Sequence, residues 1–127
     1  MCQPDPDQQP RLFVDPGEER RGYVYAGISH MRTGFKIGFT DRPPRRRGGE
    51  LRTLQMLCWW PGDRFDEQRL HQQLEPFRLA GNREWYEVRP DTLAFMIGQC
   101  QRYDFPQGLR LLQDLARDRF PDLGLAA

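Results

Sequence analysis

The chain has 127 residues, which suits one compact domain and leaves little room for a second. Its net charge is +1 and 38% of its residues are hydrophobic, so it can build a modest core, and its whole-chain charge indicates no particular partner. It lacks both the roughly 18-residue apolar run of a membrane span and the basic, then apolar, start of a secretion signal. Cys2, Cys58 and Cys100 show neither metal-ligand spacing nor a disulfide framework. These features favour a cytoplasmic protein without membrane association.

The first predicted element is a β-hairpin that follows an N-terminal arm. Residues 1–20 are rich in proline, glutamine and acidic side chains without periodicity, so we expect them to be flexible. Residues 23–28 and 35–39 are both β-prone, and the residues between them are turn formers. Two such runs joined by a short polar loop predict paired antiparallel strands.

A helix is predicted after the hairpin. It begins at Pro43–Pro44, where proline is tolerated in a first turn, and Thr40 or Asp41 can cap it. Gly48–Gly49 weakens its middle, at about 1 kcal/mol for each glycine relative to alanine. The apolar run of residues 54–60 then predicts a buried strand that ends at a Pro-Gly turn.

The second half of the chain is predicted to be mainly helical. Asp63 can cap a helix whose apolar residues fall at roughly helical spacing. Those residues are Phe65, Leu70 and Leu74. Residues 84–88 are typical of a short final strand, and two further helices are expected, one opening at Pro90 and one over 107–120. The whole order is β-β-α-β-α-β-α-α, an α+β fold with a sheet covered by helices.

Basic side chains are distributed unevenly. The 19 basic residues comprise 18 arginines and one lysine, Lys36. Four of the arginines fall within six positions: Arg42, Arg45, Arg46 and Arg47. Such a run is either a solvated helix face or a phosphate-contacting patch. Three tryptophans are expected in the core or in the wall of a groove, with base stacking by an exposed one as the alternative: Trp59, Trp60 and Trp85.

Several ordered motifs resemble one nuclease superfamily. Tyr25 and Lys36 lie eleven positions apart on the paired strands, and Arg46 follows ten positions later. The segments that carry the resemblance are Gly22–Tyr25, Lys36–Thr40, Arg45–Arg46, Leu70–His71 and Arg83–Tyr86. In this order they resemble the GIY-YIG nucleases, within the phage and bacterial branch whose second motif reads Lys-Ile-Gly-Phe-Thr. The similarity covers about residues 21–88. Lys36 stands where the founding pattern has tyrosine, as is usual in this branch.

The resemblance implies a small GIY-YIG-like domain over residues 21–103, with a three- to four-stranded, mainly antiparallel sheet flanked by helices. Residues 104–127 would form a C-terminal helical extension. The implied activity is metal-dependent endonuclease cleavage of DNA phosphodiester bonds. The alternative is a catalytically weak or inactive nucleic-acid-binding or protein-interaction module on the same fold. A targeting protein and a homodimer are both left open as partners.

The resemblance also implies a role for each site residue. Tyr25 would be the general base, and Lys36 and Arg46 would favour its phenolate by charge. Arg46, with Arg45 as its rival on spacing, would bind the scissile phosphate. Glu84 would hold Mg²⁺ or Mn²⁺, and His71 would orient or assist from a helix. The residues assigned to substrate binding are Thr40, Arg42, Arg45 and Arg47.

Overall fold

The computed structural model describes residues 22–42, 54–81 and 84–124. These contain one four-stranded antiparallel sheet of order β3-β1-β2-β4. The strands are β1 (Tyr23–Ser29), β2 (Phe35–Thr40), β3 (Leu54–Pro61) and β4 (Trp85–Tyr86). The helices are α1 (Arg64–Gln73), α2 (Pro90–Arg102) and α3 (Pro106–Arg119), with short 3₁₀ turns η4 (Glu75–Phe77) and η5 (Pro121–Leu123). The predicted α+β class is confirmed. The N-terminal arm and the helix predicted from Pro43 lie outside the described residues.

The hairpin of β1 and β2 is closed by local hydrogen bonds. The Ser29 hydroxyl accepts the backbone N–H groups of Thr33 at 2.9 Å and Gly34 at 3.3 Å. Arg32 takes a positive φ of 58°, which completes the reversal of the chain. In the resulting register Tyr25 faces Gly38 and Gly27 faces Lys36. The predicted hairpin is therefore confirmed, with a turn held by backbone hydrogen bonds and by those to the Ser29 hydroxyl.

A β-bulge in β3 changes which residues point to each side of the sheet. Cys58 pairs with Ala26 and Met56 pairs with Gly27, so Leu57 is an extra residue. Leu57 and Cys58 are both buried in the core, whereas Met56 shares the opposite face with Tyr25 and Gly27, because directly opposed residues project to the same side. Trp59, which pairs with Tyr25, lies on that face too.

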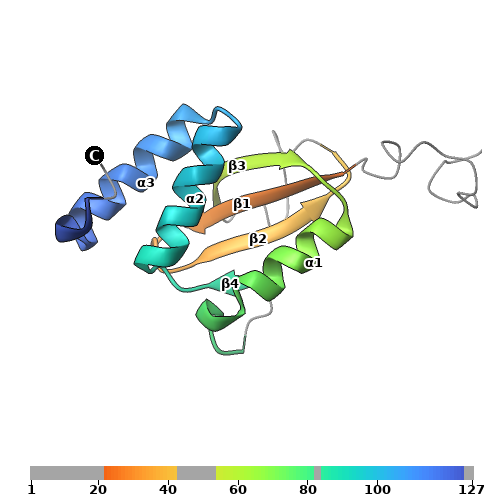
Figure 1. The fold of residues 1–127 in the computed structure, drawn as a ribbon, viewed down its shortest axis with the longest axis horizontal. Helices are drawn as coiled ribbons and strands as arrows, with labels where there is room; N and C mark the ends of the chain where they lie inside the picture. The colour runs from red at the N-terminus through yellow and green to blue at the C-terminus, as the bar shows by residue number, and fades with distance from the viewer. Residues whose placement is uncertain (1–21, 43–53, 82–83, 125–127) are drawn as a thin grey trace, which may run out of the picture.

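The core lies between the other face of the sheet and the helices. Val24, Ala26 and Ile28 are fully buried there, with Phe35 and Ile37 from β2. Figure 1 shows α2 across the ends of the strands, α1 beside β2, and α3 alongside α2. Each helix contributes buried side chains to this cluster. The face that carries Tyr25 and Lys36 is thus the one that α2 and α3 leave uncovered. Among the described helices, none is both long and apolar enough to cross a membrane.

Helix α1 begins with a reciprocal cap. The Asp63 carboxylate accepts the Asp66 N–H at 2.9 Å, and the Asp66 carboxylate accepts the Asp63 N–H at 2.9 Å. Leu70 and Leu74 are buried as their spacing predicts. Phe65 is 70% exposed, so the expectation that it shares their face is wrong.

Loss of the α1 cap gives a stability prediction. Replacing Asp63 with alanine removes an acceptor for the first turn, and we expect it to lower the free energy of unfolding by about 1 kcal/mol. Urea unfolding measures this loss. Asp63→Ser, which keeps a capping oxygen, should retain most of the stability; an equal loss in both variants would contradict the role of the cap.

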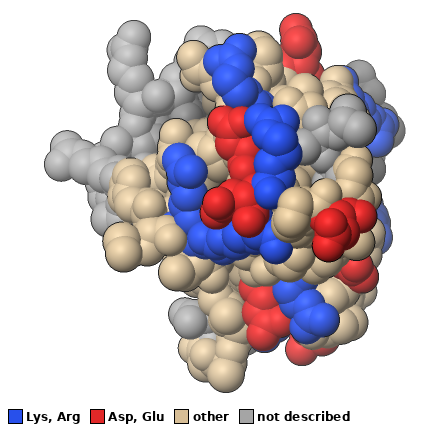
Figure 2. Space-filling model, turned by 90° about the vertical axis from the view of Figure 1, so that its left-hand side faces the viewer, with Lys and Arg blue, Asp and Glu red and all other residues tan. Residues whose placement is uncertain are grey.

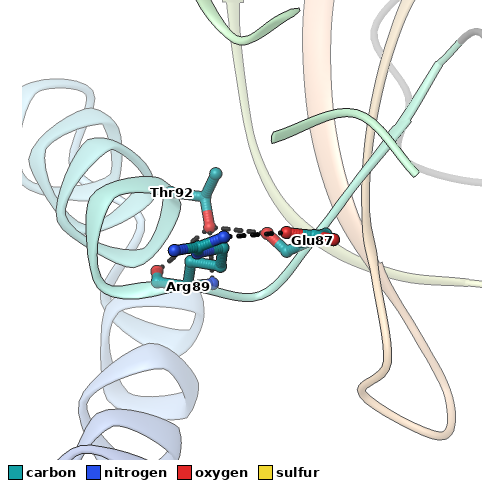
Figure 3. A network of polar contacts seen from close by, with 3 residues as sticks. All are labelled: Glu87, Arg89 and Thr92. Atoms are coloured by element: carbon teal, nitrogen blue, oxygen red, sulfur yellow. Dashed lines mark hydrogen bonds and ion pairs between the residues drawn. The ribbon is translucent and has the colours of Figure 1, made fainter. Parts of the chain in front are cut away.

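A polar network joins β4 to α2 (Figure 3). The Thr92 hydroxyl donates to the Glu87 carbonyl at 2.7 Å and accepts the Arg89 N–H at 2.9 Å, and the Arg89 guanidinium contacts the Glu87 carboxylate at 3.3 Å. Residues 87–89 therefore form the entry to α2. This corrects the strand predicted over 84–88, which is limited to Trp85–Tyr86.

Candidate active site

Tyr25 occupies space that a glycine leaves free. A Cβ atom at Gly38 would lie 2.4 Å from both Cζ and Oη of Tyr25. The phenol ring therefore lies across the Gly38 backbone, directed from β1 over β2. The Tyr25 residue is only 3% exposed. Glycine in the Lys-Ile-Gly segment thus leaves room for the Tyr25 ring, because any side chain there would displace the tyrosine.

Lys36 and Glu84 form an ion pair at the outer side of β2. Lys36 opposes Gly27, so it shares the face of Tyr25, and its residue is 5% exposed. The Glu84 carbonyl accepts the Ile37 N–H at 3.1 Å, which holds Glu84 beside β2 just before β4 begins. The Lys36 Nζ lies 3.5 Å from the Glu84 Oε1, and the Glu84 side chain is 46% exposed. The carboxylate therefore has a buried cation on one side and access to solvent on another.

Burial dominates the acid–base behaviour of Tyr25. Desolvation, followed by the negative charges of Glu84 and Glu67, raises the pKa of Tyr25 from 10.0 to about 12. The sequence led us to expect a lowered pKa, from Lys36 and Arg46. That direction is wrong for the described residues, because burial and two carboxylates disfavour the phenolate. Arg46 lies outside the described part of the chain.

The raised pKa of Tyr25 predicts alkaline sensitivity. The folded pKa of about 12 exceeds the ordinary 10.0, so the folded state favours the neutral phenol. Below pH 10 the phenol is neutral in both the folded and the unfolded state, and its full contribution to stability is present. That contribution is lost as pH rises through 12, by up to about 3 kcal/mol. Unfolding measured from pH 9 to 12 should show a smaller loss for Tyr25→Phe than for wild type. Tyr23→Phe serves as the matched control. Equal pH dependence in all three proteins would contradict the buried phenol.

His71 connects α1 to β4. Its Nδ1 shares a hydrogen bond with the hydroxyl of Tyr86, which is fully buried. Its Nε2 lies 3.3 Å from the Glu67 Oε2. Both ring nitrogens therefore have protein partners, an arrangement that suits a positioning role. Glu67 is buried and acts on Tyr25 by charge, yet the sequence analysis did not identify it. Its spacing of four residues before His71 on a helix is the signal that could have found it.

The substrate-binding residues predicted from the sequence are only partly described. The Thr40 hydroxyl accepts the Arg42 N–H at 3.3 Å, and the Arg42 side chain is exposed. Arg45, Arg46 and Arg47 lie outside the described residues, so the choice between the first two stays a prediction. Arg64 supplies a cation that the sequence analysis missed, since its guanidinium lies 4.7 Å from the centre of the Phe39 ring.

The surface that bears α3 carries both signs of charge. Figure 2 shows basic and acidic side chains interspersed over this side of the molecule. On α3 itself, Arg117 forms an ion pair with Asp114 of the preceding turn. A mixed surface of this kind lacks the single-sign field that attracts a phosphate backbone. This side of the molecule therefore does not resemble a phosphate-binding surface.

The fold and the site together define a small α+β domain with a tyrosine, a lysine and a glutamate gathered beside β2. The family model for the T5orf172 domain matches residues 22–101, so the chain belongs to the T5orf172 domain family, a phage-associated domain related to nuclease-type folds. No curated protein and no solved structure matches the chain. The match spans all four strands together with α1 and nearly all of α2.

Proposed function

We propose that this chain is a metal-dependent endonuclease that hydrolyses DNA phosphodiester bonds by a GIY-YIG-type, single-metal mechanism. The observation that carries the proposal is the placement of Tyr25, Lys36 and Glu84 on one side of β2, with the Lys36–Glu84 ion pair at 3.5 Å. A base candidate, a cation and a solvent-accessible carboxylate are the groups that such hydrolysis requires. Membership of a family related to nuclease-type folds supports the same activity.

Glu84 offers one carboxylate to a hard divalent cation. Among the described residues, no three His, Cys, Asp or Glu side chains form a group that could hold a metal ion. Glu84 would therefore hold Mg²⁺ or Mn²⁺ with water as the other ligands, which suits Mg²⁺ because it usually keeps several waters. When bound, the ion supplies Lewis-acid stabilisation of the leaving oxygen. The half-exposed Glu84 side chain is accessible for this purpose.

The side chains of the protein have complementary roles in this proposal. The Tyr25 Oη accepts a proton from the attacking water, and it can do so only as the phenolate. With a pKa of about 12, the phenolate is rare at neutral pH. Neutralising the charge of Glu84 would remove one cause of that raised pKa, so a larger fraction of Tyr25 would be ionised with a cation held at Glu84. Lys36 orients the Glu84 carboxylate, and His71 positions Glu67.

Arginine side chains complete the proposed mechanism. Arg46 would bind a scissile-phosphate oxygen with its forked donors and stabilise charge as it develops. Thr40, Arg42, Arg45 and Arg47 would hold the flanking phosphates of the DNA. Arg42 is exposed and close to the end of β2, which suits such a contact.

Plasmid nicking tests the proposed activity. Supercoiled plasmid incubated with wild-type protein and Mg²⁺ or Mn²⁺ should be converted to the open-circular form, and chelation with EDTA should stop the conversion. Absence of nicking over a range of metal and salt concentrations would overturn the proposal.

A second candidate is a nucleic-acid-binding module with weak or no catalysis. The pKa of Tyr25, which burial and two carboxylates raise to about 12, favours it, because the base is then poorly suited to neutral pH. Salt-dependent DNA binding without metal-dependent nicking would select this candidate. A protein-interaction role, a targeting protein and a homodimer stay predictions from the sequence.

A further inference from the structure

An apolar cavity of about 330 Å³ lies where the outer edge of β3 meets the start of α3. Its side-chain walls include Met56 and Trp59 from β3 and Phe105, Pro106 and Gln107 from the turn into α3. None of the lining residues is charged, and Gln107 supplies the only polar side chain among them. The volume is at the lower end of the roughly 300–1,000 Å³ typical of ligand pockets, so it suits one compact group.

The fold builds this cavity in two ways. The bulge at Leu57 places Met56 and Trp59 on the face of Tyr25, where both are partly exposed. On the α3 side, a Cβ atom at Gly108 would lie 2.2 Å from the Leu57 carbonyl oxygen, so glycine allows α3 to approach the strand closely. The positions of both sides of the cavity are thus set by the backbone, through the bulge in β3 and the close approach at Gly108. Backbone positions of this kind resist collapse of the cavity.

The aromatic walls are arranged at an angle to one another. The rings of Trp59 and Phe105 have centroids 4.6 Å apart and an interplanar angle of 61°. The two rings pack edge to face against each other, and both line the cavity. A flat, polarizable group entering it can stack on one ring and meet the edge of the other. The Gln107 amide can both donate and accept a hydrogen bond, as the edge of a nucleobase requires.

We propose that this cavity binds an unpaired base of the nucleic acid that is cut at Tyr25. This rests on the proposed function, because the base belongs to that substrate. Trp59 lies directly opposite Tyr25 on the neighbouring strand, a separation of about 5 Å between Cβ atoms. A base held there lies on the β3 side of Tyr25, and the nucleic acid would pass over β1 to reach the phosphate site beside β2. The occupant is thus a base that is single-stranded or turned out of a duplex.

Binding in an uncharged cavity can be distinguished from phosphate contacts by the salt dependence of affinity. Contacts with phosphates release counterions, so their loss changes the dependence of affinity on salt. Stacking on Trp59 involves no charge, and its loss should lower affinity without changing that dependence. Removal of one stacking aromatic is expected to weaken binding roughly 5- to 150-fold.

Binding of a labelled single-stranded DNA oligonucleotide, measured by fluorescence anisotropy in EDTA, tests the inference. Oligonucleotides that lack one base at successive positions locate the base that the wild-type protein holds; we expect one position to matter far more than its neighbours. Trp59→Ala should weaken binding to the intact oligonucleotide and have little effect on the oligonucleotide that lacks this base. Trp59→Phe should keep most of the affinity. The matched control is Phe65→Ala, which removes a 70% exposed ring on α1.

Several results would overturn the inference: additive losses from Trp59→Ala and base removal, a uniform response along the scan, no binding by wild type, or an equal loss in Phe65→Ala. If Trp59→Ala does not fold, the wild-type scan and Phe105→Leu decide the question. The outcome is separable from nicking. If Trp59→Ala and base removal weaken binding non-additively but no nicking occurs, the base site is supported and the nuclease is rejected. If nicking occurs but the two losses of affinity are additive, only the base site is rejected. Tight capture of an apolar peptide in place of the base also rejects it.

Discussion

Replacing Glu84 with glutamine is expected to abolish metal-dependent nicking, with a loss of at least about 100-fold, which is typical when a preorganised charge is removed from a catalytic site. Glutamine keeps the shape of the side chain and removes the charge that lies 3.5 Å from the Lys36 Nζ. Because Glu84 helps to raise the pKa of Tyr25, its neutralisation makes the phenol easier to ionise. A mechanism limited only by the phenolate would therefore become faster in this variant. Loss of activity despite a larger phenolate fraction points to Glu84 as the metal ligand.

The chain offers a matched control for this experiment. The Glu87 side chain is exposed to nearly the same extent as that of Glu84, at 44% against 46%. It pairs with Arg89 at the surface, where such a contact contributes little stability, typically 0–1 kcal/mol. Glu87→Gln should therefore nick plasmid at the wild-type rate. Equal activity of Glu84→Gln and wild type would contradict the proposed role of Glu84.

Local signals explain why much of the fold could be predicted. The turn at Ser29–Gly34 and the cap at Asp63 are formed by side chains next to the backbone groups that they bond, so short sequence patterns contain the necessary information. Phe65 shows the limit of such patterns. At 3.6 residues per turn it lies about 140° around the helix from Leu70, too far to share a buried face. The bulge at Leu57 depends on packing against the helices, which no period along the strand reveals.

In the candidate site too, some features follow from local sequence and others depend on tertiary packing. Tyr25 and Lys36 belong to one hairpin, so strand register alone predicts that they share a face. The raised pKa of Tyr25 depends on burial and on Glu67 of α1, and both are consequences of tertiary packing.

The pair formed by Cys58 and Cys100 in the core is another result of tertiary packing, since packing of α2 on β3 brings together two buried thiols that are far apart in the sequence. Their hydrogen bond, together with burial, raises the pKa of Cys58.

Replacing Gly38 with alanine is expected to have the second large effect, because the new methyl group would lie 2.4 Å from the Tyr25 Cζ and Oη. The ring must move, and overpacking of this kind costs about 1–3 kcal/mol of stability. Nicking should fall sharply, since the displaced phenol no longer reaches the site. In a Tyr25→Ala background the clash is absent, so Gly38→Ala should then change stability very little.

A second glycine separates this steric effect from a general effect of alanine. Gly98 lies within α2, and a Cβ atom there would meet nothing within 4 Å. Gly98→Ala should leave nicking unchanged and raise stability by up to about 1 kcal/mol, because alanine favours the helix. Urea unfolding of the two single variants and the double variant measures the coupling between Gly38 and Tyr25. If Gly38→Ala lowers the free energy of unfolding equally with and without the Tyr25 ring, the ring does not lie over this glycine. The position proposed for Tyr25 as the general base would then be wrong as well.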